Sequence, residues 1–335
     1  MQWFKKKIFV LGLLFLVYAT YFFTHLPSQT TPSHVLSATS NVSLFTQPET
    51  GKHPILDAIS QAHQEILVEM YLLSDKDIIS SLEQAKTRGV LVEVMLEQHP
   101  FGGGNLNTKT QKELTGNGIS FEWTNPRFAL THEKSIIIDG QEAFILGQNL
   151  TTSAFTKNRE YDVIDTTPQD VLEIRNIFLA DWERKSITLP QSHLVISPDT
   201  SRAALTALIQ NATESISIEI EDINDSQIVS ILSEKAKTIP VQMIVPTLTQ
   251  ISSNKDTLLQ LQSAGVQIKT LSSPYVHAKL ILVDNKKAYV GSVNLSTQSM
   301  DENRELGIII SENDTLQTLS TTFTNDWDKG ILLGQ

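Results

Sequence analysis

A set of polar residues occurs twice in this chain of 335 residues, each time 145 positions apart. The repeated positions are His132 and His277, Lys134 and Lys279, Asp139 and Asp284, Asn149 and Asn294, and the Asn-Arg-Glu triplets at 158–160 and 303–305. The same offset continues into segments 178–182 and 323–327, where Phe, Asp and Trp recur. Chance can supply one shared tripeptide, but not so many polar residues in one register. The chain therefore contains an internal duplication.

Each copy alternates segments of strand and helix character. The apolar run 65–72 corresponds to residues 216–220, where isoleucines alternate with Ser217 and Glu219 in the period of a half-buried strand. Further strands are predicted at 90–96, 135–138, 241–245 and 280–283, and helical spacing is present at 78–85 and 228–236. The pattern predicts two similar α/β/α lobes with mixed sheets, at 42–190 and 191–335, related by a pseudo-two-fold axis.

The N-terminal segment lies outside the repeat. Three lysines at 5–7 precede an apolar run from Ile8 to Phe23, which Leu26 extends to a marginal membrane span. We predict a signal anchor over residues 1–26, with a cleaved signal peptide as the alternative. Residues 27–41, rich in Ser, Thr and Pro, are predicted to form a linker. The lysines should remain cytoplasmic, so we expect the body on the extracytoplasmic side, anchored or exported.

Composition narrows the function. The formal net charge is −11, and the three lysines at 5–7 make the rest more acidic still. Nucleic-acid binding depends on neutralising phosphates with cations, so an acidic body disfavours a nucleic-acid substrate, although a local basic groove could still sit on it. The chain has no cysteine, which excludes disulfides and thiolate metal sites.

The repeated residue types suit chemistry on a phosphodiester. On a strand, the His and Lys of His-x-Lys would share one face because side chains alternate with a period of two. An ammonium group offsets the charge of non-bridging phosphate oxygens, and the asparagine 17 residues after each histidine can donate further hydrogen bonds. Glu160 and Glu305, each 28 residues after a histidine, could accept Nδ1–H and leave Nε2 free to react.

The pattern His-x-Lys-x4-Asp followed by Gly-Ser-x-Asn resembles the signature of the phospholipase D superfamily. The second copy, from His277 to Asn294, matches in full; the first departs where Leu146 and Gly147 replace Gly and Ser. The resemblance implies one active site at the lobe interface, built from both motifs. It also implies that His132 attacks phosphorus to form a phosphohistidine. His277 would then protonate the leaving alcohol and activate water or a second alcohol.

The candidate residues follow from the repeat and the resemblance together. They are His132 and His277 for catalysis, Lys134, Asn149, Lys279, Ser292 and Asn294 for phosphate binding, Glu160 and Glu305 for orienting the histidines, and Asp139 and Asp284 for structure. No metal or other cofactor is expected, because the two histidines are needed for catalysis and no His/Asp cluster with ligand spacing lies elsewhere.

Other conspicuous residues receive structural interpretations. Arg159 and Arg304 either brace a strand or contact substrate, and Trp182 and Trp327 should belong to the core. Six histidines do not recur in register and are interpreted as ordinary polar residues: His25, His34, His53, His63, His99 and His193. The glycine-rich stretch 101–105 lacks the Gly-Lys-Ser/Thr of a phosphate loop and is predicted to lie at the pocket rim.

These observations favour a phospholipase D that hydrolyses phospholipid head groups at a membrane surface, acting as a monomer. The alternatives are phosphatidyl transfer to an alcohol, as in cardiolipin synthases, and a nuclease on the same scaffold. Cardiolipin synthases usually carry two N-terminal spans and a longer chain, which favours hydrolysis here. A binding protein on an inactive scaffold would be expected to have lost a His or Lys, and all four are present.

Overall fold

The computed structural model describes residues 41–190, 192–250 and 254–334. The predicted signal segment 1–26, and all but the last residue of the predicted linker 27–41, lie outside the described residues. Within the described ranges, no helix combines the length and apolar character needed to cross a membrane.

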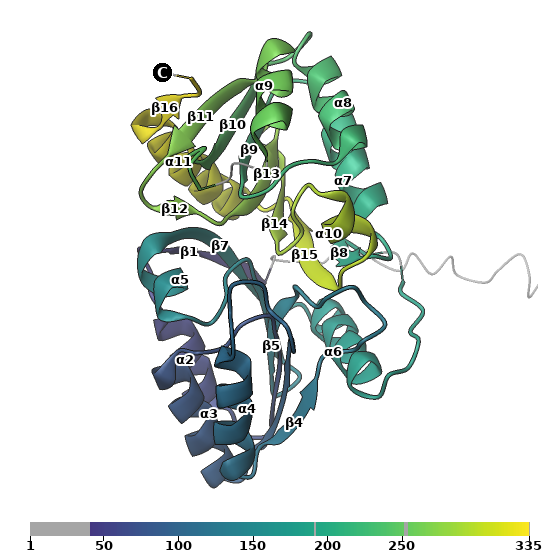
Figure 1. The fold of residues 1–335 in the computed structure, drawn as a ribbon. Helices are drawn as coiled ribbons and strands as arrows, with labels where there is room; N and C mark the ends of the chain where they lie inside the picture. The colour runs from purple at the N-terminus through teal and green to yellow at the C-terminus, as the bar shows by residue number, and fades with distance from the viewer. Residues whose placement is uncertain (1–40, 191, 251–253, 335) are drawn as a thin grey trace, which may run out of the picture. The chain divides into compact units, whose positions relative to one another are not determined.

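The first lobe carries the purple-to-teal elements of Figure 1. Its elements are β1 (Val42–Gln47), α2 (His53–Gln61), β2 (Glu65–Met70), α3 (Lys76–Thr87), β3 (Leu91–Leu96), α4 (Leu106–Gly116), β4 (Ser120–Trp123), β5 (Lys134–Ile138), β6 (Glu142–Leu146), α5 (Thr152–Lys157), β7 (Asn158–Asp165) and α6 (Pro168–Trp182).

The second lobe, green to yellow in Figure 1, repeats this order. Its elements are β8 (Leu194–Ser197), α7 (Ser201–Gln210), β9 (Ile216–Ile220), α8 (Ser226–Lys235), β10 (Val241–Pro246), α9 (Lys255–Ser263), β11 (Gln267–Leu271), β12 (Tyr275–Val276), β13 (Lys279–Val283), β14 (Lys287–Gly291), α10 (Thr297–Asp301), β15 (Glu305–Ile310), α11 (Asn313–Lys329) and β16 (Ile331–Leu332).

The two sheets have the same strand order. The first runs β1-β7-β6-β5-β2-β3-β4, and the second runs β8-β15-β14-β13-β9-β10-β11 with β16 at its edge. In each, three strands are parallel (β2-β3-β4 and β9-β10-β11), and the other strands of these two orders pair antiparallel. Off this order, β12 of the second lobe pairs parallel with β7. The prediction of two duplicated α/β lobes with mixed sheets is confirmed.

Helices cover both faces of each sheet. Helices α2, α3 and α4 pack side by side on the first sheet, as α7, α8 and α9 do on the second. Each group has its own apolar core. On the other faces, α6 and α11 contribute to a third core that contains residues of both sheets. This shared core joins the two lobes into one packed body.

One expectation about burial is wrong. The alternation in β9 predicted a half-buried strand, but Glu219 is fully buried and hydrogen-bonded by the Tyr161 hydroxyl (2.7 Å), which belongs to the first lobe. Burial raises the pKa of Glu219 to about 8. The polar face of this strand is covered by the other lobe, so a pattern that normally marks a solvent-facing side marks the lobe interface here.

Candidate active site

Each His-x-Lys motif is hydrogen-bonded to the opposite lobe. The amides of His132 and Glu133 donate to the Arg304 carbonyl oxygen (2.8 and 2.9 Å), which lies just before β15. In the related position, β12 runs parallel to the start of β7, and the His277 amide donates to the Arg159 carbonyl oxygen (3.3 Å). Strands β5 and β13 begin only at the lysines, so the histidines precede the strands, contrary to the prediction of a strand position.

The carboxylates that hold the histidines are exchanged between the lobes. His132 Nδ1 lies 2.9 Å from Glu305 Oε2, and His277 Nδ1 lies 2.9 Å from Glu160 Oε2. The equal spacing of 28 residues suggested that each glutamate serves the histidine of its own copy; the structure corrects that pairing. The exchange follows from the backbone, because each histidine segment is hydrogen-bonded to the strand that carries the other copy's glutamate.

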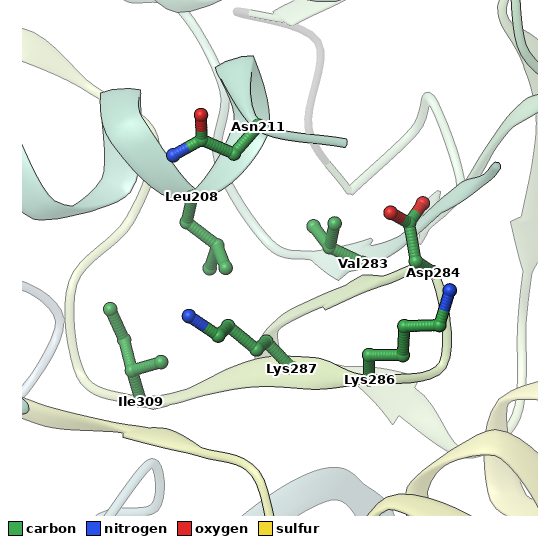
Figure 2. Close-up of a pocket in the computed structure, with 7 residues that line it drawn as sticks. All are labelled: Leu208, Asn211, Val283, Asp284, Lys286, Lys287 and Ile309. Carbon is green, nitrogen blue, oxygen red and sulfur yellow. The ribbon is translucent and has the colours of Figure 1, made fainter. Parts of the chain in front are cut away.

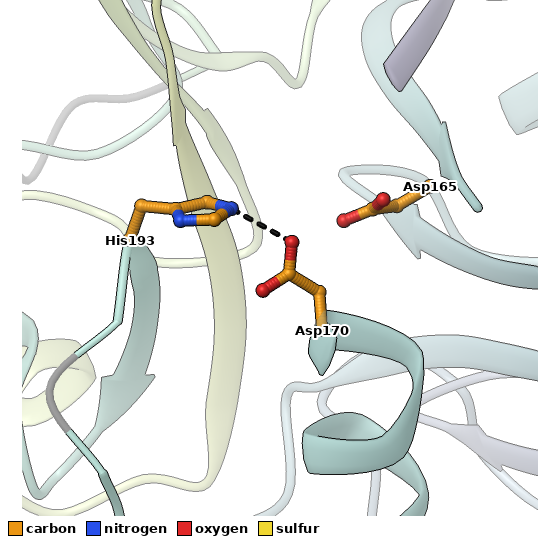
Figure 3. A group of neighbouring side chains, drawn as sticks. All are labelled: Asp165, Asp170 and His193. Carbon is orange, nitrogen blue, oxygen red and sulfur yellow. Dashed lines mark hydrogen bonds and ion pairs between the residues drawn. The ribbon is translucent and has the colours of Figure 1, made fainter. Parts of the chain in front are cut away.

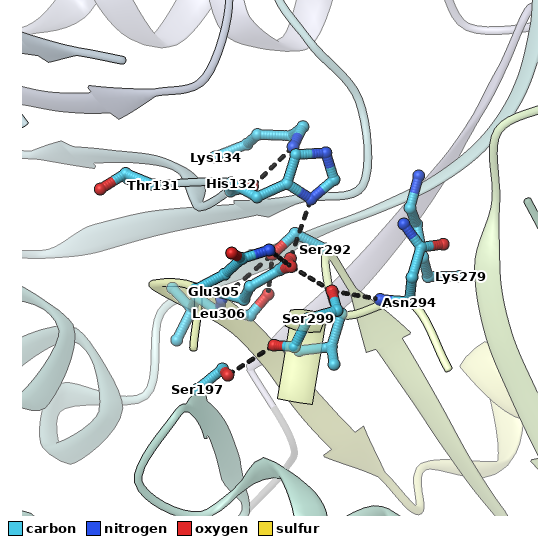
Figure 4. A network of polar contacts seen from close by, with 12 residues as sticks. Thr131, His132, Lys134, Ser197, Lys279, Ser292, Asn294, Ser299, Glu305 and Leu306 are labelled. Atoms are coloured by element: carbon cyan, nitrogen blue, oxygen red, sulfur yellow. Dashed lines mark hydrogen bonds and ion pairs between the residues drawn. The ribbon is translucent and has the colours of Figure 1, made fainter. Parts of the chain in front are cut away.

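Both glutamates are fully buried and held by neighbours. Ser299 donates to Glu305, and the Asn303 amide lies 3.3 Å from the same carboxylate oxygen, as Figure 4 shows in part. In the first lobe, Asn158 donates to Glu160 (3.0 Å). The asparagine of each Asn-Arg-Glu triplet therefore fixes the glutamate that fixes a histidine.

The environment of His132 favours a neutral imidazole with its lone pair on Nε2. Burial, and then the charge of Lys134, lower the pKa of His132, which keeps the imidazole neutral near pH 7. The proton on Nδ1 is directed at Glu305, so the lone pair lies on Nε2. Burial disfavours the charged form of Glu305, but its interactions with His132 and Lys134 lower the pKa of Glu305 below the usual value.

The first lysine is buried without an ion pair among the described residues. Lys134 Nζ donates to the His132 carbonyl oxygen (2.5 Å) and lies 5.1 Å from the centre of the Tyr71 ring. Burial, and then the nearby charge of Lys279, lower the pKa of Lys134 to about 7. A bound phosphodiester anion would favour its protonated form.

The second lysine has an acidic partner that the sequence analysis did not identify. Lys279 Nζ donates to the His277 carbonyl oxygen (2.6 Å) and to Glu221 Oε2 (2.9 Å). Glu221 directly follows the strand predicted at 216–220, and nothing in the 145-residue register marks it. Its place in the repeat is found only by aligning Glu219-Ile220-Glu221 with Glu69-Met70-Tyr71, at an offset that differs from 145 residues.

Phosphate binding by Asn149 and Asn294 stays a prediction, because a phosphate oxygen would need their Nδ2 donors and the unpaired atoms are their Oδ1 acceptors. The side-chain oxygens of Asn149 and Asn294 are buried and accept no hydrogen bond from the described residues. Figure 4 places Asn294 beside Lys279. Ser292 differs, because its hydroxyl donates to the Leu306 carbonyl (3.2 Å) and accepts from the Leu306 amide (3.1 Å). A phosphate contact by Ser292 therefore stays a prediction that requires a change of partner.

The motif aspartates lie at the far ends of β5 and β13. Asp139 accepts the amides of residues 63–65, and Asp284 accepts those of residues 213–215. Each thus ties a hairpin turn to the start of a neighbouring strand. Beside the Asp284 turn is a cavity lined by Leu208, Asn211, Val283, Asp284, Lys286, Lys287 and Ile309 (Figure 2). It lies roughly 17 Å along β13 from Lys279, at ~3.3 Å per residue, and is separate from the histidines.

The two arginines of the triplets connect the lobes. Arg159 pairs with Asp326 of α11 (2.5 Å), and Arg304 pairs with Asp181 of α6 (2.7 Å). Both arginines are almost completely buried, which supports bracing over contact with substrate. The tryptophans one residue further along, Trp182 and Trp327, stack on Phe178 and Phe323 at the edge of the shared core.

Away from the motifs, Asp165, Asp170 and His193 bring possible ligand atoms within 4.8 Å of one another (Figure 3). The prediction of no metal site, which rested on ligand spacing along the sequence, stays a prediction. The members of the cluster come from the end of β7, the first turn of α6 and the segment before β8, so their spacing in sequence gives no sign of it. His193 Nε2 lies 2.8 Å from Asp170 Oδ2, and this ion pair satisfies both side chains. We assign no ion to the cluster.

Comparison with known proteins identifies the scaffold. The family model described as "Cardiolipin synthase, PLD-like domain" matches twice, at residues 55–182 and 205–327. The chain belongs to the phospholipase D superfamily. The two matches correspond to the two lobes, which explains why each lobe supplies one histidine motif.

Curated relatives of this phospholipase D-like chain are cardiolipin synthases. Cardiolipin synthase 2 of Bacillus cereus is 25% identical, in an alignment that covers 82% of this chain. The chain spans only 62% of the length of that protein. Cardiolipin synthase B of Salmonella typhi is 26% identical, covering 79% of this chain and 75% of its own length. Among solved structures, the phosphatidylserine synthase of Haemophilus influenzae shares the fold, with 12% identity, a TM-score of 0.66 and coverage of 88% and 87%.

Proposed function

We propose that this protein is a phosphatidyl transferase of the cardiolipin synthase type, acting through a phosphohistidine. The observation that carries the proposal is the pair of motif histidines whose Nδ1 atoms are each held by a buried glutamate of the other lobe. That arrangement leaves two Nε2 atoms for one phosphodiester. The names of the curated relatives favour transfer to an alcohol over the hydrolysis expected from the sequence.

The reaction has two steps with one histidine in each role. His132 Nε2 attacks phosphorus, the bond to the head-group oxygen breaks, and that oxygen takes a proton from His277. The hydroxyl of a second phospholipid's glycerol head group then gives its proton to His277 and attacks phosphorus, which releases His132. Lys134, Lys279, Asn149 and Asn294 would balance the charge on the non-bridging oxygens.

The membrane attachment remains part of the proposal. An N-terminal anchor would hold the body beside the extracytoplasmic leaflet, where both donor and acceptor lipids are present. Phe101, at the start of the glycine-rich stretch, is 93% exposed, and its backbone amide donates a hydrogen bond to the hydroxyl oxygen of Tyr71 (2.5 Å), whose ring contacts His132. An exposed aromatic ring so near the histidines suits contact with a lipid surface.

The test is a product assay on vesicles of phosphatidylglycerol, with the head group labelled. Transfer predicts cardiolipin and free glycerol in equal amounts; hydrolysis predicts phosphatidate and glycerol. The His132→Ala variant should give neither. A protein that cleaves single-stranded or duplex DNA and leaves the lipid intact would contradict the proposal.

A further inference from the structure

The two halves of the site differ at one pair of equivalent positions. Met70 pairs with Lys134 across β2 and β5, and Ile220 pairs with Lys279 across β9 and β13. The residue that follows, Tyr71 in the first half and Glu221 in the second, therefore occupies the same place beside each motif. An aromatic ring and a carboxylate have different consequences for the adjacent histidine.

In the second half, the carboxylate faces the reactive side of the histidine. Glu221 Oε2 lies 3.4 Å from His277 Nε2 and 2.9 Å from Lys279 Nζ. The Tyr275 hydroxyl donates to the other oxygen, Oε1 (3.1 Å). The positive charges of His277 and Lys279 lower the pKa of Glu221 to about 2, although burial opposes this, so the group is anionic at neutral pH.

In the first half, the equivalent residue offers no proton acceptor to the histidine. The Tyr71 ring meets the His132 ring edge to face, with centroids 4.8 Å apart. The Tyr71 hydroxyl is turned to the Phe101 amide, which donates to it. His132 Nδ1 has the Glu305 partner, and no carboxylate of the described residues pairs with its Nε2.

These contacts favour protons on different ring nitrogens in the two imidazoles. A carboxylate can only accept hydrogen bonds. His277 lies between Glu160 on Nδ1 and Glu221 on Nε2, so a proton on each nitrogen satisfies both contacts. His132 needs only the Nδ1 proton for Glu305, which leaves a lone pair on Nε2.

We propose that Glu221 is a positioning residue that assigns the two histidines their roles, by holding the Nε2 proton of His277 for the leaving alcohol while His132 stays the nucleophile. The inference rests on the proposed two-histidine reaction and adds a residue that breaks its symmetry. In the first step, the Nε2 lone pair of His132 forms the N–P bond, the P–O bond to the head group breaks, and the departing oxygen takes the proton that Glu221 had oriented. When the acceptor alcohol returns a proton to His277 Nε2, that proton again contacts the Glu221 carboxylate.

The first test uses two donors that differ in their need for a proton. An alkyl head group, as in phosphatidylglycerol, must be protonated on leaving, whereas a nitrophenyl phosphodiester leaves with little assistance. Glu221→Gln should lower kcat for phosphatidylglycerol roughly 10²-fold, at the low end for loss of proton transfer, and change kcat for the nitrophenyl ester less than about threefold. KM should not rise, because the substitution removes a negative charge beside the phosphate site.

The second test exchanges the residues that differ between the two halves, Tyr71 and Glu221. Glu221→Tyr makes the second half resemble the first, and the double variant Tyr71→Glu with Glu221→Tyr reverses the two. After reaction with the nitrophenyl ester and acid-free denaturation, peptide mass mapping should find the phosphoryl group on His132 in the wild type. It should appear on both histidines in the single variant and mainly on His277 in the double variant.

The outcomes separate this inference from the proposed function. If the wild type forms no adduct on either histidine, the proposed function fails. If adducts form but Glu221→Gln slows both donors equally or slows neither, Glu221 does not assign the roles. An adduct that stays on His132 in Glu221→Tyr has the same meaning. Glu214→Gln, an exposed acid-to-amide change in the same lobe, is the matched control. If the tyrosine variants fold poorly, the isosteric Glu221→Gln variant still tests the inference.

Discussion

The two copies of the motif share their backbone and differ in what surrounds it. The second copy has a small Ala278 between His and Lys and a carboxylate, Glu221, at the site; the first has Glu133 between them and an aromatic ring, Tyr71. The first histidine thus contacts one acid and an aromatic ring, and the second is placed between two acids. A duplicated scaffold can bring two equivalent groups together, but unequal neighbours are needed before one can act as a nucleophile and the other as an acid.

The largest effect should come from removing each histidine in turn. His132→Ala should abolish both turnover and the covalent adduct. His277→Ala should lower turnover of an alkyl donor by roughly 10²–10⁴-fold, since it removes the proton donor. With a nitrophenyl donor it should still form an adduct, which then persists because the group that activates the acceptor is gone. An adduct found on His277 in the His132→Ala variant would reverse the assignment of the two halves.

The exchanged glutamates give the next largest effect. Glu305→Gln should impair formation of the adduct, because Glu305 holds His132, and Glu160→Gln should impair the leaving-group step, because it holds His277. A loss of about 10²-fold or more is expected for each, by analogy with the acid that orients a catalytic histidine. Single-turnover kinetics with the two donors distinguishes the steps. If Glu160→Gln blocks adduct formation from the nitrophenyl ester and Glu305→Gln does not, the crossed pairing is incorrect.

The buried Glu133 should make the free energy of unfolding depend on pH. Burial raises the pKa of Glu133 to about 7, so the folded state binds a proton more tightly than the unfolded state. The stabilising contribution is complete below the unfolded pKa of 4.5 and is lost as pH rises through about 7. At pH 8, Glu133→Gln should raise the free energy of unfolding by up to about 3 kcal/mol.

Urea denaturation of the wild type and Glu133→Gln at pH 5 and pH 8 measures this difference. The gap between the two proteins should be small at pH 5 and largest at pH 8. Glu214→Gln, at an exposed ion pair of the other half, should change stability by less than about 0.5 kcal/mol at both values. A gap that is the same at pH 5 and pH 8 would mean that Glu133 does not bind the proton.

The acid limb of the pH–rate profile should report on the first half. Because the pKa of His132 is lowered from 6.5, kcat/KM for the nitrophenyl ester should fall only below pH 6.5 as His132 becomes protonated. Glu305→Gln removes an interaction that raises this pKa, so the limb should move to still lower pH. An acid limb above pH 6.5 that is unaffected by Glu305→Gln would assign the titration to another group.

The smallest effect should come from Phe101, which belongs to the first half. Phe101→Ser should lower activity on vesicles a few-fold and leave activity on a soluble nitrophenyl phosphodiester unchanged, because the side chain is almost fully exposed. Vesicle sedimentation measures the binding directly. Equal losses on both substrates would place Phe101 in the support of Tyr71 instead of at a lipid surface.

The duplication, the two α/β lobes and the motif that places the chain in its superfamily could all be predicted from the amino-acid sequence. These follow from residue types at fixed separations along one chain, which periodicity and register reveal directly. The positions of the β2, β3, β5, β9, β10 and β13 strands and of the α3 and α8 helices follow from the same local signals.

How the two halves combine could be learned only from the contacts between the folded lobes. The partner of each histidine, the burial of Glu219 and the contact of Glu221 with His277 all depend on which surfaces of the two lobes meet. Equal spacing in the two copies makes pairing within a lobe and pairing between lobes indistinguishable in sequence. The backbone hydrogen bonds that link each histidine segment to the opposite strand select the second arrangement, because they carry His132 to Glu305 and His277 to Glu160.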